Sequence, residues 1–364
     1  MLIAIQQVWA QIKNPRNLPF DWSTDTTNHV IDLSEITIVV PRGTFPNIDY
    51  PPFLGKKKGL EAFFEHEPVI AVEINGHAKA YPLNMLTSHE MSNDTLAGVP
   101  ILPTYCPLCN ASITYDRRFD NRILEFEVSG MLRNSDMVML DRVTQTLWQQ
   151  LTGEGIVGEY AGKHLAVVPS LVLTVKEFFQ RYEHGQILSP NNGTRAAARY
   201  GINPYEGYDN IDASPYDRFF KSENIDRRLP PMERVVDIRV GEDYKVYPFS
   251  ILASQEVIND SFKGKNVVLF HQGDAVSVLD KSRISESRKI GTATVFNAKL
   301  DDRSLTFSRK KGQFIDEQTE SRWDITGHCI SGELKGKQLI IEPHSNHFAF
   351  AWLAFRPNSE IYEK

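Results

Sequence analysis

Two of the three cysteines in this chain, Cys106 and Cys109, lie three positions apart in the segment Tyr-Cys-Pro-Leu-Cys-Asn. Thiolates at this spacing bind one cation together or close one small disulfide, so the pair predicts either a metal site or a redox site. The third cysteine, Cys329, is far away in the sequence, beside His328. A structural role is favoured for Cys329, because a single neighbouring histidine does not make up a set of metal ligands.

The residues around the pair favour a metal knuckle over a thioredoxin-like site. Residues 111–115 are expected to form a strand, whereas a thioredoxin-type pair lies at the N-terminus of a helix, whose dipole lowers the pKa of the first thiol. Asn110 suits the left-handed conformation that such turns often need. The chain has no second Cys-x-x-Cys, which excludes a four-cysteine zinc ribbon. Histidine, methionine, carboxylate or water must therefore complete any metal shell.

His89 is the nearest candidate nitrogen ligand. It precedes the cysteine strand, on or just after a short expected helix, and the matching position in the second half of the chain holds Gln255. The histidine thus accompanies the thiol-bearing half. Three methionines, Met131, Met137 and Met139, follow the pair and would suit copper, although methionine usually fills a core. The pair is a candidate for metal binding, for reversible thiol chemistry, or for structural burial.

A second histidine pair, His344 and His347, has the spacing that places two rings on one side of a helical turn. These rings are candidate metal ligands if the last helix packs against the cysteine turn. Otherwise they cap backbone N–H groups at the start of that helix. The polar segment 129–136 has two interpretations. In the functional one, it presents hydrogen-bond donors and a carboxylate over a pocket. The favoured alternative is a turn held by Asn, Ser and Asp side chains.

The composition is that of an ordinary soluble globular protein of 364 residues, with 41% hydrophobic and 24% charged residues. A net charge of -6 argues against a nucleic-acid-binding face. The chain lacks a P-loop, a dinucleotide fingerprint and a Gly-x-Ser-x-Gly motif, so no nucleotide cofactor is expected. No membrane span is expected. Residues 1–10 are apolar without a basic start, which predicts a cytoplasmic protein, or a periplasmic or exported one whose signal has been removed.

An internal repeat organises the chain. Residues 69–83 reappear in outline as residues 235–249, and the match continues at later positions, at which Cys106 and Cys109 correspond to Gln272 and Ala275. The first unit alone therefore carries the thiol pair. The predicted parts are an N-terminal extension (1–59), a first unit (60–184), a packed, tyrosine-rich connector (185–232) and a second unit (233–364).

Each unit is predicted to begin with a hairpin, because apolar and polar residues alternate around a turn, and a Tyr-Pro pair then begins a short helix. Strands are expected at 99–105, 111–117, 123–128 and 137–140. A capping box begins a closing helix at 174, and aromatic residues in the last helix are expected to face the core. The predicted fold class is α+β and β-rich, with two homologous units of twisted antiparallel sheet or partly open barrel and short helices.

The order of these motifs resembles the bacterial family catalogued as domain of unknown function 3179. The resemblance covers most of the chain from about residue 60 onward, and its most specific elements are Tyr-Cys-Pro-Leu-Cys and Ser-Gly followed by Asn-Ser-Asp. The full set is His89-Glu90, Asn93-Asp94, 105–109, Ser129-Gly130, 133–136, Asp141-Arg142, Trp148, Pro204-Tyr205, Tyr208, 228–231 and Tyr247-Pro248. The resemblance implies a shared site and no established activity. Members of this family often carry export signals and usually have Gly at the position of Asn110.

The functional hypothesis is a soluble metal-binding protein, in which Cys106 and Cys109 are thiolate ligands and His89 is the nearest nitrogen ligand. Copper or zinc fits these donors, and the hypothesis extends to redox activity at the site. The alternative is a binding or scaffold protein with a structural or disulfide-forming cysteine pair and an unknown small-molecule or protein partner. The sequence does not decide whether the chain is an enzyme.

Overall fold

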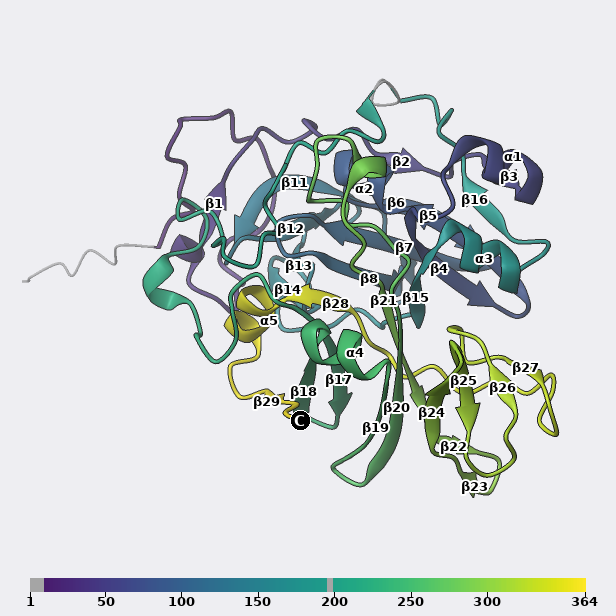
Figure 1. Ribbon diagram of the computed structural model, residues 1–364. Helices are drawn as coiled ribbons and strands as arrows, with labels where there is room; N and C mark the ends of the chain where they lie inside the picture. The colour runs from purple at the N-terminus through teal and green to yellow at the C-terminus, as the bar shows by residue number, and fades with distance from the viewer. Residues whose placement is uncertain (1–9, 195–198) are drawn as a thin grey trace, which may run out of the picture.

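The computed structural model describes residues 10–194 and 199–364. Within them the chain is mostly β, arranged in several curled antiparallel sheets with five short α-helices, which confirms the predicted β-rich α+β class (Figure 1). The helices are α1 (Lys56–Ala62), α2 (Leu83–His89), α3 (Val175–Arg181), α4 (Phe249–Gln255) and α5 (Ala349–Phe355).

Three larger sheets form the first half of the molecule. One has the order β15-β4-β5-β16-β3, with β15 (Ser170–Thr174), β4 (Pro68–Ile74), β5 (His77–Pro82), β16 (Gln186–Leu188) and β3 (Phe53–Gly55). The second has the order β2-β6-β7-β8, with β2 (Ile48–Asp49), β6 (Ser92–Leu96), β7 (Val99–Cys106) and β8 (Ala111–Asp116). The third has the order β1-β11-β12-β13-β14, with β1 (Ile36–Ile38), β11 (Phe126–Arg133), β12 (Asp136–Asp141), β13 (Leu147–Gln149) and β14 (Gly155–Val157).

Three more sheets follow in the second half. Their orders are β28-β17-β18-β29, β19-β20-β21 and β24-β25-β26-β27. The strands are β17 (Arg234–Val240), β18 (Asp243–Pro248), β19 (Val257–Phe262), β20 (Lys265–Gln272), β21 (Thr292–Asn297), β24 (Phe307–Lys310), β25 (Gln313–Asp316), β26 (Arg322–Trp323), β27 (Cys329–Ser331), β28 (Asn346–Phe348) and β29 (Glu360–Ile361). Two small hairpins add β9 (Arg118–Phe119), β10 (Arg122–Ile123), β22 (Lys299–Leu300) and β23 (Arg303–Ser304).

The two halves make the same contacts at matching positions. In both, a proline caps a seven-residue helix that ends in a left-handed glutamate, Glu90 after α2 and Glu256 after α4. Tyr81 and Lys79 both donate to Asp94 in the first half, and Tyr247 and Lys245 both donate to Asp260 in the second. Likewise, the indole N–H of Trp148 donates to Asp141, and that of Trp323 donates to Asp316. A duplicated unit would give such pairs, although duplication of the chain stays a prediction.

The closing strand of each half packs against the other half. Strand β15 pairs with β4 and also contacts β21, while β28 pairs with β17 and also contacts β8. Figure 1 shows β28, in yellow, running beside the blue first-half strands. The Phe348 amide donates to the Cys109 carbonyl oxygen at 2.8 Å. The C-terminal strand therefore covers the cysteine turn.

The expected helix starts agree with the structure. Helix α3 begins at the capping box of Thr174 and Glu177, whose side chains satisfy each other's backbone N–H groups. Phe348 and Trp352, before and within α5, are buried in the main core, and Phe355 packs against it. This confirms that the aromatic stripe is core.

The segment 129–136 differs from the expected loop. Strand β11 continues through it to Arg133, across a bulge between Val128 and Met131. The bulge requires Gly130, whose φ is +82° and whose Cβ, if it had one, would lie 2.1 Å from the Val40 carbonyl oxygen. Only Asn134 and Ser135, both in the left-handed region, form the turn into β12. The bulge therefore replaces most of the predicted loop with paired strand.

The connector is packed, as predicted, in the part that the structure describes; residues 195–198 lie outside it. Tyr208 and Phe220 are buried, and Tyr200, Tyr205 and Tyr216 pack against the same core. The first residues of the predicted connector form β16, which pairs with β5 and β3, so they belong to the first-half sheet. The domain boundaries otherwise stay a prediction. In residues 10–194 and 199–364, we find no helix with the length and apolarity needed to cross a membrane.

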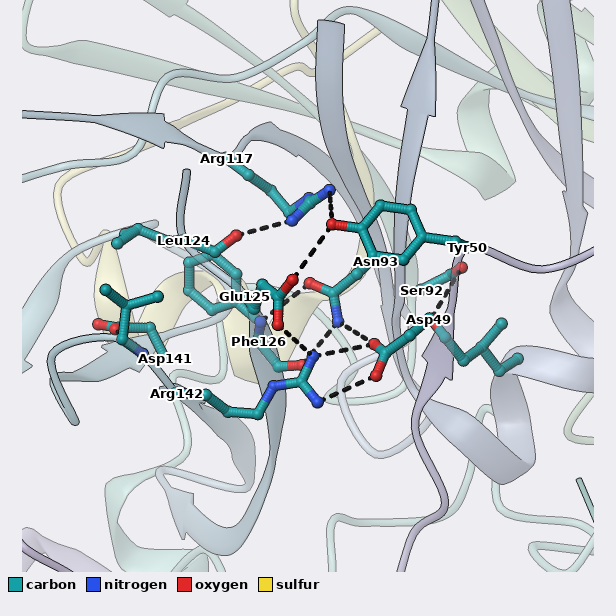
Figure 2. Close-up of polar contacts among 12 residues, drawn as sticks. Asp49, Tyr50, Ser92, Asn93, Arg117, Leu124, Glu125, Phe126, Asp141 and Arg142 are labelled. Carbon is teal, nitrogen blue, oxygen red and sulfur yellow. Dashed lines mark hydrogen bonds and ion pairs between the residues drawn. The ribbon is translucent and has the colours of Figure 1, made fainter. Parts of the chain in front are cut away.

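A polar network ties the first-half sheets together (Figure 2). Its centre is Arg117, whose side chain is fully buried just after β8. The guanidinium donates to the carbonyl oxygens of Ile101, Leu124 and Asp94 at 3.1, 2.8 and 2.9 Å, and to the Tyr50 hydroxyl at 3.4 Å. Neutral acceptors thus satisfy a buried cation, which holds β6, β7 and the segment between β10 and β11 at one point.

The outer part of the network joins β2, β6 and β12. Arg142, after β12, makes a two-pronged ion pair with Asp49 at 2.9 and 3.1 Å and reaches Glu125 at 3.2 Å. Asn93 on β6 donates to Asp49 and exchanges hydrogen bonds with the backbone of Phe126 (Figure 2). These contacts fix β11 and β12 beside β6 and β7, the strand that carries the cysteine pair.

Candidate metal centre

The cysteine turn connects two buried strands without a helix. Strand β7 ends at Cys106, and β8 begins at Ala111. The Cys109 amide donates to the Cys106 carbonyl oxygen and the Asn110 amide to that of Pro107, each at 3.3 Å. Asn110 has a φ of +50°, the left-handed conformation expected from its type. This geometry agrees with a knuckle and gives neither thiol a helix dipole.

A carboxylate joins the two thiols. The Sγ atoms of Cys106 and Cys109 and a carboxylate oxygen of Asp136 lie within 4.8 Å of one another, and all three residues are buried. Asp136 comes from the start of β12, which the hairpin with β11 brings over the turn. Across residues 10–194 and 199–364, this is the one such group of three among His, Cys, Asp and Glu side chains.

One oxygen of Asp136 is held and the other is unpaired. Oδ2 accepts from the Gln149 side-chain amide at 2.6 Å and from the Leu151 backbone amide at 2.9 Å. Oδ1 is buried and has no hydrogen-bond partner among the described residues. A buried carboxylate oxygen without a partner is unfavourable, and a bound cation would remove that cost. The two bonds to Oδ2 also fix the orientation of the side chain, as outer contacts of metal ligands do.

Burial favours the neutral forms of all three groups. It raises the pKa of the Cys106 and Cys109 thiols, and the nearby Asp136 charge raises both further. Burial also raises the pKa of Asp136 to about 6, although its hydrogen bonds from Gln149 and Leu151, and then the weaker contacts of the Cys109 and Cys106 thiols, act in the opposite direction. A cation at the centre of the three would reverse this balance, because it stabilises thiolate and carboxylate together.

A second carboxylate lies close to the group. Glu90 follows α2 and is buried, and its backbone carbonyl accepts from the Tyr105 amide at 2.7 Å. Burial, and then the charge of Asp136, raise the pKa of Glu90 to about 8. Tyr205 of the connector is near Glu90 and Cys106, since the charges of both raise the pKa of its hydroxyl beyond what burial does. The surroundings of the thiols are therefore acidic and aromatic.

His89 is not brought into the group. Its Nδ1 is 2.7 Å from the Pro46 carbonyl oxygen, and its Nε2 is 2.7 Å from the Tyr200 hydroxyl. Both ring nitrogens are thus occupied by the loop before β2 and by the connector. Burial lowers the pKa of the ring, so the neutral form is favoured. His89 fastens the connector to α2, and the third donor beside the thiols is a carboxylate instead.

His344 and His347 also lie outside the group, even though their strand covers the cysteine turn. The Nε2 of His347 is 3.1 Å from Oδ1 of Asp237 on β17, and its ring packs on Trp352 with 4.7 Å between centroids. The Nδ1 of His344 is 2.6 Å from the carbonyl oxygen of Glu342. His347 therefore ties β28 to its neighbour β17, and His344 contacts the backbone two residues before it.

The other soft-atom candidates are core residues. Met137 and Met139 belong to the main hydrophobic core, and Met131 belongs to a separate cluster around β1. Cys329 is buried, with its Sγ 3.4 Å from the Ser331 carbonyl oxygen, and is not part of the cluster. The structural interpretation of Cys329 agrees with this placement. All three cysteines are free thiols in the structure.

The comparisons place the chain in a family without naming a function. Residues 42–359 match the family model described as a protein of unknown function, DUF3179. The chain belongs to this family, as its motif order indicated. No curated protein and no solved structure matches the chain significantly.

Proposed function

We propose that the chain is a metal-binding protein in which Cys106, Cys109 and Asp136 hold one zinc ion. The observation that carries this proposal is the unpaired Oδ1 of Asp136 within reach of two free, buried thiols. Two sulfurs and one oxygen drawn from a short turn and one strand are a donor set that zinc accepts in tetrahedral geometry.

The donor types favour zinc over copper. Copper(I) prefers an all-soft shell of thiolates and thioethers, whereas the third donor here is a hard carboxylate oxygen. Zinc is of borderline softness and accepts sulfur and oxygen together. Three protein ligands leave one tetrahedral position, which a water molecule fills in sites of this type. Such a site differs from a closed four-cysteine structural site, because an exchangeable position remains.

Metal analysis of the purified protein tests the proposal. We expect about one zinc per chain in the wild type after incubation with zinc and desalting, and a large loss in Cys106→Ser/Cys109→Ser. Asp136→Asn should weaken zinc binding by about 10-fold or more, because it removes the charged oxygen. Cys329→Ser is the matched control, since it removes a buried thiol outside the cluster, and its zinc content should be that of the wild type.

Equal zinc content in the wild type and the double cysteine variant would overturn the proposal. The rival is a scaffold protein whose cysteine pair is structural or forms a disulfide. Intact mass without reductant separates the two, because a disulfide makes the chain lighter by two hydrogens. A zinc-free wild type with that mass difference, abolished in Cys109→Ser, would establish the rival.

A further inference from the structure

The second half holds a cavity where the first half holds the cysteine group. Strand β20 ends at Gln272, and the matching strand β7 ends at Cys106. The backbone amide of His271 donates to the Glu256 carbonyl oxygen, and in the same way the amide of Tyr105 donates to the Glu90 carbonyl oxygen. Gln272 lines a cavity of about 320 Å³. Residues at the start of β25 and just after β26 also line the cavity. In the first half, the matching segments are the start of β12, which carries Asp136, and the end of β13 with the residues after it, which donate hydrogen bonds to Asp136.

An arginine without hydrogen bonds lines this cavity. The Arg309 side chain is only 13% exposed. Across residues 10–194 and 199–364, its guanidinium makes no hydrogen bond, and its one ion-pair contact is with Glu256 at 3.7 Å from Nε. Its guanidinium lies over the Phe314 ring, 4.0 Å from the centroid. The ring orients the flat group and leaves its N–H donors free to bind a ligand.

Arg309 differs from the buried arginines Arg117 and Arg234, because both of those donate hydrogen bonds within the protein. Arg117 donates to three carbonyl oxygens and a hydroxyl, and Arg234 donates to Asp209 and Ser277. A largely buried guanidinium with open donors is unfavourable unless something else accepts from them. The missing acceptor in the Arg309 cavity is therefore what a ligand would supply.

The rest of the lining defines the class of ligand. Arg181, whose Nε is buried and also without a partner, adds a second guanidinium, and Gln180 and Gln313 add amides. Three carboxylates oppose an anion. Glu256 lies beside Arg309, and Glu177 and Asp324 line the cavity. Glu177 accepts from Thr174 and Gln272, and Asp324 accepts from the backbone amide and hydroxyl of Thr326 and from the His328 amide.

We infer that this cavity binds a small organic carboxylate, with Arg309 as its principal anchor. A planar carboxylate matches the fork of a guanidinium in a two-pronged pair. Glu177 and Asp324 would repel a doubly charged phosphate more strongly than a singly charged carboxylate. The apolar side chains of Phe314, Ile325 and Ile330 on the same wall suit a carbon skeleton attached to the acid group. This site is separate from the proposed zinc centre.

Calorimetric titration with benzoate and with inorganic phosphate tests this inference. Benzoate should bind the wild type saturably with a Kd of about 1 mM or below, and more tightly than phosphate. Arg309→Met should weaken benzoate binding about 10-fold or more, and Arg309→Lys should weaken it too, because lysine has no planar fork. Arg303→Gln, which removes an exposed arginine paired with Glu333, is the control and should bind as the wild type does.

Thermal unfolding in a buffer free of carboxylate and phosphate supplies an independent readout. Arg309→Met should unfold at the same temperature as the wild type or about 2–4 °C higher, because the variant loses a largely buried charge that has no hydrogen bond and only a long ion-pair contact with Glu256. A merely structural arginine would give a lower temperature on removal. Benzoate binding that is equal in the wild type and Arg309→Met, or absent from the wild type, would overturn the inference, and tighter binding of phosphate would overturn the carboxylate assignment.

Discussion

Replacing Arg117 by methionine is expected to destabilise the first half by roughly 3–5 kcal/mol, since three buried carbonyl oxygens would lose their donor at once. The carbonyls belong to Ile101, Leu124 and Asp94, which lie on or beside three different strands. Methionine fills most of the volume and has no N–H group. The loss therefore comes from unsatisfied backbone acceptors more than from a cavity.

Urea unfolding of the two proteins at equal pH measures this loss as a difference in the free energy of unfolding. The control is Arg118→Met, one residue further along. Arg118 is exposed and pairs with Asp116, so its removal should cost far less stability than the removal of Arg117. Similar losses of stability in both variants would contradict the prediction, because they would show that the hydrogen bonds from Arg117 to the carbonyl oxygens contribute no extra stability.

Local sequence patterns were sufficient to predict the strands, helix and turn that border the site. Alternating residues before a Tyr-Pro pair predicted the hairpin and helix α2, because both period-two burial and a proline directly before a helix depend on near neighbours. The position of Asn110 between the cysteine pair and β8 likewise indicated a left-handed turn. The strand after that turn separated this pair from the thioredoxin type.

The third donor could not be found in the same way. Asp136 reaches the thiols only because the Gly130 bulge and the turn at 134–135 set the register of β12, and a shift of one residue would point its side chain to the other face. The sequence did mark 129–136 as polar and carboxylate-bearing. His89 is closer in type to an expected ligand, but its ring is taken by Pro46 and Tyr200, partners far away in the sequence.

The contrast between the halves also depends on long-range packing. The sequence match aligned Gln272 with Cys106, which predicted that the second half has no thiol site. It gave no sign of a cavity, because Arg309 and Arg181 come from segments with no shared motif. Helix α3 reaches the second half through long-range hydrogen bonds, from Gln272 to Glu177 and from Arg181 to Gln338, and these contacts bring Arg181 to the cavity.

Glu67, just before β4, should make the stability of the protein fall as the pH rises. The side chain is 1% exposed, and its Oε1 has no hydrogen-bond partner among the described residues. Burial raises the pKa of Glu67 from 4.5 to about 8, and Asn84 beside it offsets this only in part. Its counterpart by sequence match, Glu233, has an acceptor role instead, because its Oε1 accepts from the Ser250 amide at 2.9 Å.

The sign follows from comparing the folded and unfolded chains. Below pH 4.5 the Glu67 carboxyl is protonated in both, so it adds no pH dependence. Between 4.5 and about 8 the unfolded chain releases the proton while the folded chain keeps it, and stability falls by up to about 1.4 kcal/mol per pH unit. Above about 8 both forms are ionised and the loss is complete.

Glu67→Gln should remove this dependence, because an amide does not ionise. We expect the variant to equal the wild type near pH 4 within about 1 kcal/mol and to exceed it by roughly 4 kcal/mol at pH 8. Urea unfolding of both proteins across this range measures the difference. Glu61→Gln, on the exposed face of α1, controls for the loss of one negative charge. A difference that stays constant from pH 4 to 8 would mean that the Glu67 carboxyl has the same pKa in the folded and unfolded chains, which would contradict the prediction.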